Sequence, residues 1–171
     1  KVLDILKEEG VPATFFLLGE NIRQNPDITL RIEREGHLLA NHSWSHPDFR
    51  LLSTEEILEE EINPTATLLE ELTGTSNRYL RPPYGAINDE TILTLGEKGW
   101  SIINWSLDTF DWDSASPEEI LDKVSAYSHN GAIILLHSAG GNRENTVLAL
   151  PALIAFLKDE GYGFVTVDEL H

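Results

Sequence analysis

Two histidines four residues apart are the first residues in this sequence whose types and spacing suggest chemistry. His42 and His46 lie in the stretch 41–47, which reads NHSWSHP. Neutral imidazole is the commonest protein ligand for transition metals, and two on one short segment can fill two positions around one ion. Pro47 disfavours helical geometry at His46, so we expect the pair in a loop. Two imidazoles favour zinc, cobalt, nickel or iron over magnesium or calcium, and Asp48 is the local candidate for a third ligand.

A proline-rich stretch at residues 81–85, RPPYG, is the second candidate. Its two prolines stiffen the backbone and lack an N–H, so the next available donor is the N–H of Tyr84. A rigid loop that presents one N–H is typical of an oxyanion hole. Arg81 has two interpretations: an ion pair with a buried carboxylate, or a surface residue before a turn.

The third and fourth candidates are the stretch 108–112, DTFDW, and His137 at the end of an apolar run. Next to a metal and a carboxylate, His137 could act as a general acid, and the alternative is a histidine near solvent. We expect Asp111, beside Trp112, to orient an imidazolium or an arginine. Asp108 is interpreted as a structural loop residue.

The elements that must position these groups alternate between short apolar strands and amphipathic helices. This alternation predicts parallel strands with helical crossovers in one α/β domain over residues 1–171. About six strands are too few for a complete eight-stranded barrel and also fit an open sheet, and in both arrangements functional groups collect at the carboxyl ends of strands. We predict helices at residues 1–9, 22–35, 53–72, 88–99, 116–127 and 146–160, and strands at residues 13–18, 37–40, 79–81, 100–107, 131–137 and 163–167.

The composition excludes several classes of partner. The formal net charge of -17 argues against nucleic acid, whose phosphates are bound by Lys and Arg, and against an anionic lipid surface. A neutral or cationic substrate is compatible with it. The absence of cysteine excludes disulfides, thiolate metal sites and a cysteine nucleophile. No apolar run approaches the roughly 20 residues of a membrane span, and the sequence does not indicate an oligomeric state.

Taken in order, these motifs resemble those of the polysaccharide deacetylases, carbohydrate esterase family 4. The stretch 42–47 resembles the metal-binding histidine pair of the family, and 81–85 resembles its rigid catalytic-groove loop. The stretch 108–112 resembles its Asp-Trp groove segment, and 135–137 resembles the Leu-x-His segment that brings the catalytic acid. The resemblance covers nearly the whole chain and implies a distorted (β/α) barrel with fewer than eight parallel strands.

The resemblance also implies a reaction, the removal of acetyl groups from a polysaccharide. The expected substrate contains N-acetylglucosamine, as in peptidoglycan or a chitin-like glycan. His42 and His46 are expected to hold a divalent metal, zinc in preference to cobalt, nickel or manganese. The Tyr84 N–H is then expected to stabilise the oxyanion, and His137 to protonate the leaving amine.

The remaining residues of the motifs receive supporting roles by the same resemblance. Asp111 is expected to tune His137 or to hold Arg81. Since the family acts on glycans outside the cell, the resemblance implies a bacterial enzyme that is secreted or on the cell surface. The residues expected to line the substrate groove are Trp112, Leu135 and Pro83.

The sequence departs from the family pattern at one point. In the family an earlier strand ends in Thr-Phe-Asp-Asp-Gly, which supplies the general base and the third metal ligand, and no Asp-Asp pair occurs in these 171 residues. Residues 1–9 resemble the helix that follows that strand. We therefore expect the first strand to be missing from this chain, and its activity and metal affinity to be weakened.

Two other functions fit the same residues. The first is an O-deacetylase of acetylxylan, because the same groups act on an ester as on an amide. The second is a non-catalytic carbohydrate-binding domain, in which Trp112, Tyr84 and Trp44 would be stacking platforms. Glycan binding that a chelator does not change would favour the second.

Overall fold

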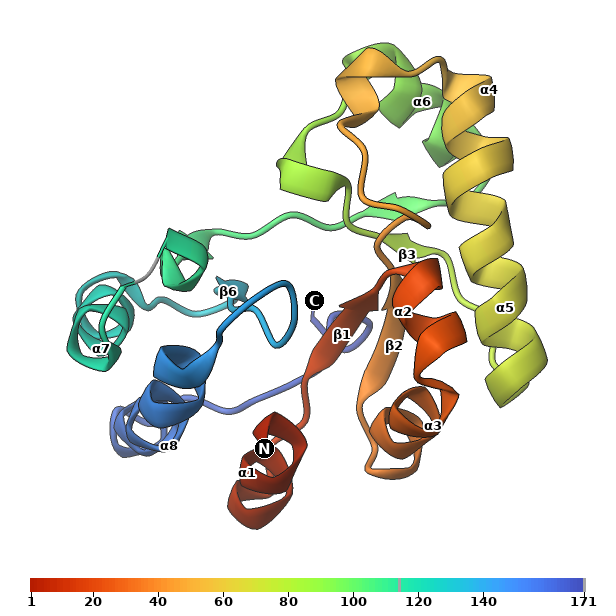
Figure 1. Cartoon of the computed structure of the whole chain (residues 1–171). Coiled ribbons are helices and arrows are strands. Elements are labelled where there is room, and N and C mark those ends of the chain that lie inside the picture. Colours follow the sequence, from red (N-terminus) through yellow and green to blue (C-terminus); the bar gives the residue numbers. More distant parts are fainter. Residues whose placement is uncertain (114, 171) are drawn as a thin grey trace. The chain divides into compact units, whose positions relative to one another are not determined.

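The computed structural model describes residues 1–113 and 115–170 as two compact units, and Ser114 and His171 lie outside the described residues (Figure 1). One unit comprises Thr14–Asn104, and the other comprises Lys1–Ala13 with Trp105–His171. The prediction of one domain over residues 1–171 is not tested by this division and stays a prediction.

The unit Thr14–Asn104 is built on a parallel sheet with the strand order β1-β2-β3-β4. In the register of this sheet Leu17 pairs with Asn41, and Asn41 pairs with Leu80. His42 and Arg81, the residues that follow β2 and β3, therefore lie next to each other at the carboxyl ends of these two adjacent strands. The strands are β1 (Thr14–Leu17), β2 (Leu38–Asn41), β3 (Tyr79–Leu80) and β4 (Ser101–Ile102).

Helices of this unit bury an apolar cluster that includes Phe49, Ile57, Ile62, Leu80 and Leu95. A capping box starts the longest helical segment, which passes through a π-helical turn before it ends at Gly74. The helical elements are α2 (Gly19–Gln24), α3 (Pro26–Arg34), η1 (Phe49–Leu51), α4 (Thr54–Glu56), the π turn η2 (Ile57–Ile62), α5 (Asn63–Thr73), η3 (Pro83–Gly85) and α6 (Asp89–Glu97).

The other unit has a two-stranded parallel sheet, β5 with β6, in which Leu107 pairs with Ile134 and Asp108 with Leu135. Helix α8 contacts both α7 and α1, and the Lys158 Nζ lies 2.8 Å from a carboxylate oxygen of Glu9 across the α1–α8 contact. The elements are α1 (Val2–Glu9), β5 (Leu107–Asp108), η4 (Asp111–Asp113), α7 (Pro117–Tyr127), β6 (Ile134–Leu135) and α8 (Glu144–Asp159).

The predicted α/β class with parallel strands is confirmed. Capping boxes start the helices expected at 53–72 and 116–127, since the hydroxyl oxygens of Ser53 and Ser116 each accept a hydrogen bond from the backbone N–H three residues later. In the described parts of the chain, no helix combines the length and apolar character that crossing a membrane requires.

Three element predictions were wrong. The helix expected at 22–35 is split into α2 and α3, because Pro26 forces the preceding Asn25 out of helical geometry, with φ of -136°. The strand expected at 100–107 is two short strands in different sheets. Residues 163–167 form no strand among the described residues, because they join no hydrogen-bonded ladder.

Candidate active site

The histidine pair leaves the carboxyl end of β2, and its rings lie edge to face with centroids 5.0 Å apart. The Nδ1 of His42 lies 2.7 Å from the carbonyl oxygen of Arg81. A carbonyl oxygen only accepts, so Nδ1 carries a proton, and the neutral ring has its lone pair on Nε2. Metal-ligating histidines are commonly fixed in this way, by a backbone carbonyl that accepts from the other ring nitrogen.

The donor set of this pair fits two positions around a divalent ion. Within residues 1–113 and 115–170, no group of three or more His, Cys, Asp or Glu side chains is placed to hold a metal. Asp48, the local candidate for a third ligand, is instead paired with the Arg50 guanidinium. Hydrogen bonds from Arg50 lower the pKa of Asp48 to about 2. The described chain therefore offers two imidazole ligands.

Arg81 is buried, which excludes the surface interpretation of this residue. Its guanidinium donates to the carbonyl oxygens of Ile103 and Asn104, each at 3.1 Å, and lies 4.0 Å above the ring of Phe16. Burial lowers the pKa of Arg81 to about 10, so the side chain stays charged at neutral pH. In these contacts Arg81 fastens the chain after β4 to the edge of the sheet that carries the histidines.

Tyr84 adopts a left-handed backbone conformation, with φ of 59°. This costs a non-glycine residue on the order of 1–3 kcal/mol, and such residues cluster at functional sites. The turn is closed by the N–H groups of Gly85 and Ala86, which donate to Pro82 and Pro83; the Tyr84 N–H takes no part in that closure. The Tyr84 ring lies edge to face on the His46 ring, with centroids 4.6 Å apart.

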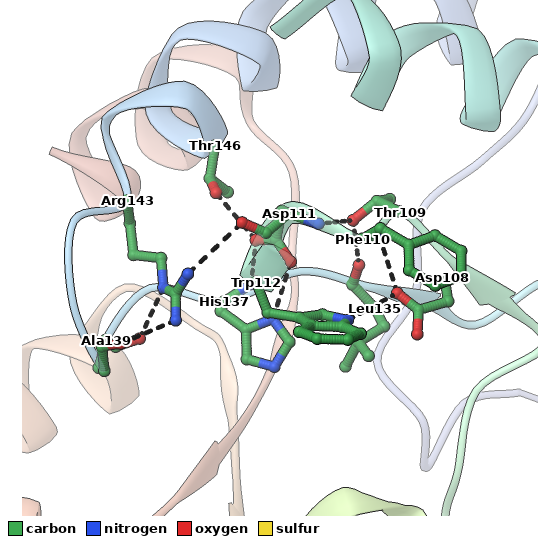
Figure 2. A network of polar contacts seen from close by, with 11 residues as sticks. Asp108, Thr109, Phe110, Asp111, Trp112, Leu135, His137, Ala139, Arg143 and Thr146 are labelled. Carbon is green, nitrogen blue, oxygen red and sulfur yellow. Dashed lines mark hydrogen bonds and ion pairs between the residues drawn. The ribbon is translucent and has the colours of Figure 1, made fainter. Parts of the chain in front are cut away.

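In the other unit a buried carboxylate holds His137 at two points (Figure 2). The Asp111 carboxylate accepts from the His137 ring Nδ1 at 2.8 Å and from the His137 backbone N–H at 2.7 Å. It also accepts from the Thr146 hydroxyl at 2.8 Å. The Asp111 side chain is fully buried, whereas that of His137 is 34% exposed.

The protonation states of this pair follow from its contacts. Burial acts to raise the pKa of Asp111, but hydrogen bonds from His137 and Thr146 outweigh it and lower the pKa below its usual value. Asp111 is therefore ionised at neutral pH and binds the Nδ1–H of His137. Proton exchange with a substrate is left to the Nε2 of His137.

The surrounding loops are fixed by further hydrogen bonds (Figure 2). Arg143 donates to the carbonyls of Ala139 and Gly140 and reaches the Asp111 carbonyl at 3.4 Å. Asp108 accepts from the Phe110 N–H at 2.8 Å and the Trp112 indole N–H at 3.3 Å. These contacts hold the two loops that carry Asp111 and His137.

The predicted substrate-binding residues differ in accessibility. Trp112 is 48% exposed and can meet a ligand. Leu135 is buried in β6, where its carbonyl accepts from Thr109, and Pro83 is buried in η3.

The structure thus gathers the predicted residues into two groups, one in each unit. His42, His46, Arg81, Pro83 and Tyr84 lie in Thr14–Asn104. The other unit contains Asp111, Trp112, Leu135 and His137.

Sequence reasoning missed several residues that support these groups. Glu61 is 7% exposed and accepts hydrogen bonds from the loop between the two histidines. A signal was present, because Glu61 shares the apolar face of its helix with Ile57, Leu58 and Thr65. Asn41 and Thr146 carried no pattern that distinguishes them from ordinary core and helix residues.

Comparison with known proteins agrees with the resemblance in the motifs. A family model described as polysaccharide deacetylase matches residues 1–103. A peptidoglycan-N-acetylglucosamine deacetylase of Bacillus cereus is 40% identical over 171 residues, which cover 99% of this chain and 62% of that protein.

Solved structures show the same similarity. The crystal structure of the Bc1960 peptidoglycan N-acetylglucosamine deacetylase matches with a TM-score of 0.95 and 39% identity, over 99% of this chain and 79% of that one. A family pseudoenzyme from Bacillus anthracis, BA3943, matches with a TM-score of 0.90 and 33% identity, over 99% of this chain and 58% of that one. The predicted fold class, an incomplete (β/α) barrel, is confirmed by this likeness. The family model matches more than half of the residues of this chain, and the motifs and the fold agree with it. The chain therefore belongs to the polysaccharide deacetylase family.

Proposed function

We propose that this chain is the catalytic domain of a metal-dependent hydrolase that removes N-acetyl groups from a polysaccharide, the N-acetylglucosamine residues of peptidoglycan in the first place. The observation that carries the proposal is the contact between Asp111 and His137. A buried, ionised carboxylate that fixes one ring nitrogen of a histidine whose side chain is 34% exposed is suited to proton transfer.

In the proposed reaction His137 donates a proton from Nε2 to the nitrogen of the leaving amine. Asp111 stabilises the imidazolium form and keeps the ring in one tautomer, because Nδ1 stays hydrogen-bonded to it. Amine expulsion from an amide is slow without a proton donor, and a positioned acid contributes typically 10²–10⁴-fold to such a step.

The other group of residues is proposed to bind the acetyl group. The Tyr84 N–H donates to the oxyanion that forms when water adds to the acetyl carbonyl carbon, before the C–N bond breaks and releases acetate and the amine. A divalent ion held by His42 and His46, with zinc preferred and cobalt, nickel or manganese as alternatives, would supply a Lewis acid for that oxygen. The proposal assigns no general base, because the sequence has no counterpart of the Asp-Asp pair of the family.

The proposed contact to the sugar is Trp112, whose exposed ring can stack on a pyranose face. A peptidoglycan substrate also supports a location on the bacterial cell surface or outside the cell. Cell fractionation followed by immunodetection tests this location, and a purely cytoplasmic signal would contradict it.

The function is tested by acetate release from substrates with a labelled acetyl group, which keeps slow turnover measurable. We expect the chain, supplied with zinc, to release acetate from N-acetylglucosamine oligomers or peptidoglycan, and His137→Ala to reduce this release about 100-fold or more. Release from acetylxylan alone would favour the O-deacetylase alternative. Glycan binding with no acetate release, unchanged by a chelator, would overturn the proposal in favour of a binding domain.

A further inference from the structure

A buried carboxylate lies behind the loop that joins the two histidines. One oxygen of Glu61 accepts from the backbone N–H groups of Trp44 and Ser45, at 2.7 and 2.8 Å. The other oxygen accepts from the Ser45 hydroxyl at 2.7 Å. Short hydrogen bonds to an ionised acceptor are stronger than those between neutral groups. Three of them end on one side chain that is 7% exposed.

The backbone of the loop between the histidines is strained, and the hydrogen bonds to Glu61 hold it in that conformation. Ser43 and His46 both have left-handed backbones, with φ of 75° and 68°. Neither is a glycine, and each such residue costs on the order of 1–3 kcal/mol unless its surroundings hold it. The two residues between them are Trp44 and Ser45, and Glu61 accepts hydrogen bonds from their N–H groups. Glu61 therefore fixes the middle of the strained segment.

A π-helical turn presents Glu61 to this loop. The turn η2 interrupts the helix that runs from Thr54 to Thr73, and its buried residues include Glu61 and Ile62. A second bridge runs parallel to the first, because the Asn41 side-chain amide donates to the Ile62 carbonyl at 2.9 Å and its oxygen accepts from the Ser43 N–H at 2.9 Å. Single π turns within α-helices are frequent at functional sites.

The amino end of α2 supports the loop from another side. The N–H groups of Gly19 and Glu20 donate to the carbonyls of Ser43 and Trp44, at 3.0 and 3.2 Å. These donors hold the carbonyl side of the loop, whereas Glu61 is the acceptor for its N–H side. The loop conformation that carries His46 is thus set by groups that do not themselves bind metal.

We infer that Glu61 is a positioning residue that holds the 43–46 loop in the strained conformation from which His42 and His46 bind metal. This inference rests on the metal site of the proposed function. It predicts that Glu61 raises the affinity for metal and slows amide hydrogen exchange in the loop, in addition to any contribution to folding. Loss of an outer residue that orients metal ligands typically lowers metal affinity 10–100-fold.

The test compares Glu61→Leu, Glu61→Gln and the control Glu60→Leu, which changes an exposed residue of the same turn. Zinc alone is titrated into each metal-free protein by calorimetry. Amide hydrogen exchange of Trp44 and Ser45 is measured by NMR on the same samples. We expect Glu61→Leu to lower zinc affinity at least 10-fold and to speed exchange of these two amides, with Leu39 in β2 unchanged. Glu61→Gln should have a zinc affinity and exchange rates between those of Glu61→Leu and the wild type. The control Glu60→Leu should match the wild type in both.

The outcomes separate this inference from the proposed function. Wild-type zinc affinity and wild-type exchange in Glu61→Leu would overturn it. If that variant does not fold, Glu61→Gln decides, because a neutral acceptor weakens the same bonds, and wild-type values would again overturn the inference. If the wild-type chain binds no zinc, the metal site of the proposed function fails, and exchange at Trp44 and Ser45 alone decides the role of Glu61.

Discussion

At the scale of single residues, the two carboxylates that matter each accept three hydrogen bonds. Asp111 accepts from the His137 ring, the His137 backbone and Thr146, and Glu61 accepts three bonds from two loop residues. A carboxylate held in this way orients the groups that donate to it. Both side chains therefore act through another residue.

Asp111→Asn is the most direct test of the His137 contact. The amide accepts less strongly and presents an N–H where an acceptor is needed, so the imidazolium of His137 loses its counter-charge. We expect acetate release to fall about 100-fold or more, with KM for the glycan little changed. Asp108→Asn is the matched control, since the Phe110 N–H and the Trp112 indole N–H both donate to the Oδ1 of Asp108, an oxygen that asparagine keeps. A rate for Asp111→Asn within twofold of wild type would contradict the proposed role.

Thr146→Val is expected to shift acid unfolding. The pKa of Asp111 is lower in the folded protein than in the unfolded chain, since hydrogen bonds outweigh burial. Asp111 thus stabilises the fold above its unfolded pKa of about 3.9, and this contribution disappears as the pH falls through the lower folded value. Removing the Thr146 hydroxyl raises the folded pKa, so stability should be lost at higher pH.

The measurement is tryptophan fluorescence during acid titration. At neutral pH we expect Thr146→Val to cost about 1–3 kcal/mol in the free energy of unfolding, because Asp111 loses a buried partner. Thr146→Ser keeps the hydroxyl and should titrate like the wild type. Equal acid midpoints for Val and Ser would show that the hydroxyl does not stabilise the charge of Asp111.

At the scale of elements, the sequence predicts where strands and helices lie better than where they stop. Capping boxes at Ser53 and Ser116 form because their chemistry is local. The break at Asn25 is also local, because Pro26 disfavours helical geometry at the residue before it. The π turn η2 and the division of 100–107 between two sheets depend on packing partners distant in sequence, so local propensity does not predict them.

Gly19→Ala tests the packing at the amino end of α2. A Cβ there would overlap the Trp44 ring and lie 2.6 Å from the Thr65 hydroxyl oxygen. We expect a loss of about 1–3 kcal/mol in the free energy of unfolding, together with weaker zinc binding, because Trp44 belongs to the loop between the histidines. Urea unfolding and zinc titration measure the two effects.

The control for this packing effect is Gly96→Ala in α6. No atom lies within 4 Å of a Cβ built there, and alanine favours a helix interior over glycine by roughly 0.5–1 kcal/mol. This variant should therefore be stabilised. A Gly19→Ala protein as stable as wild type would mean that Trp44 can move aside at little cost.

At the scale of the whole molecule, the motifs predicted the family and the α/β class, and both are confirmed. Motif residues were readable because their types are restricted by chemistry: imidazoles for a metal, prolines for a rigid loop, a carboxylate beside an imidazole. Asn41 and Thr146 were not readable, because they are defined only by what the fold places beside them. Glu61 was marked only by its position on the apolar face of a helix. The catalytic and metal-binding roles stay predictions.

A double-mutant comparison tests whether both units serve one reaction. His42→Ala and His137→Ala are each expected to reduce acetate release by about 100-fold or more. If both histidines act in one reaction, the double variant should lose far less than the product of the two losses, because residues that act as a unit are strongly non-additive. His129→Ala, in the same unit as His137, serves as the control. A loss of acetate release in the double variant equal to the product of the two single losses would indicate that the two histidines act independently.

The left-handed backbones of Ser43, His46, Tyr84 and Phe110 have a consequence for laboratory evolution. Glycine adopts this conformation without the steric penalty that a side chain pays. A selection for heat resistance alone should therefore enrich glycine at these positions and erase a proposed metal ligand along the way. Glycines should accumulate at these positions under thermal selection and revert when growth depends on glycan processing. That result would show that these positions lower stability in return for activity.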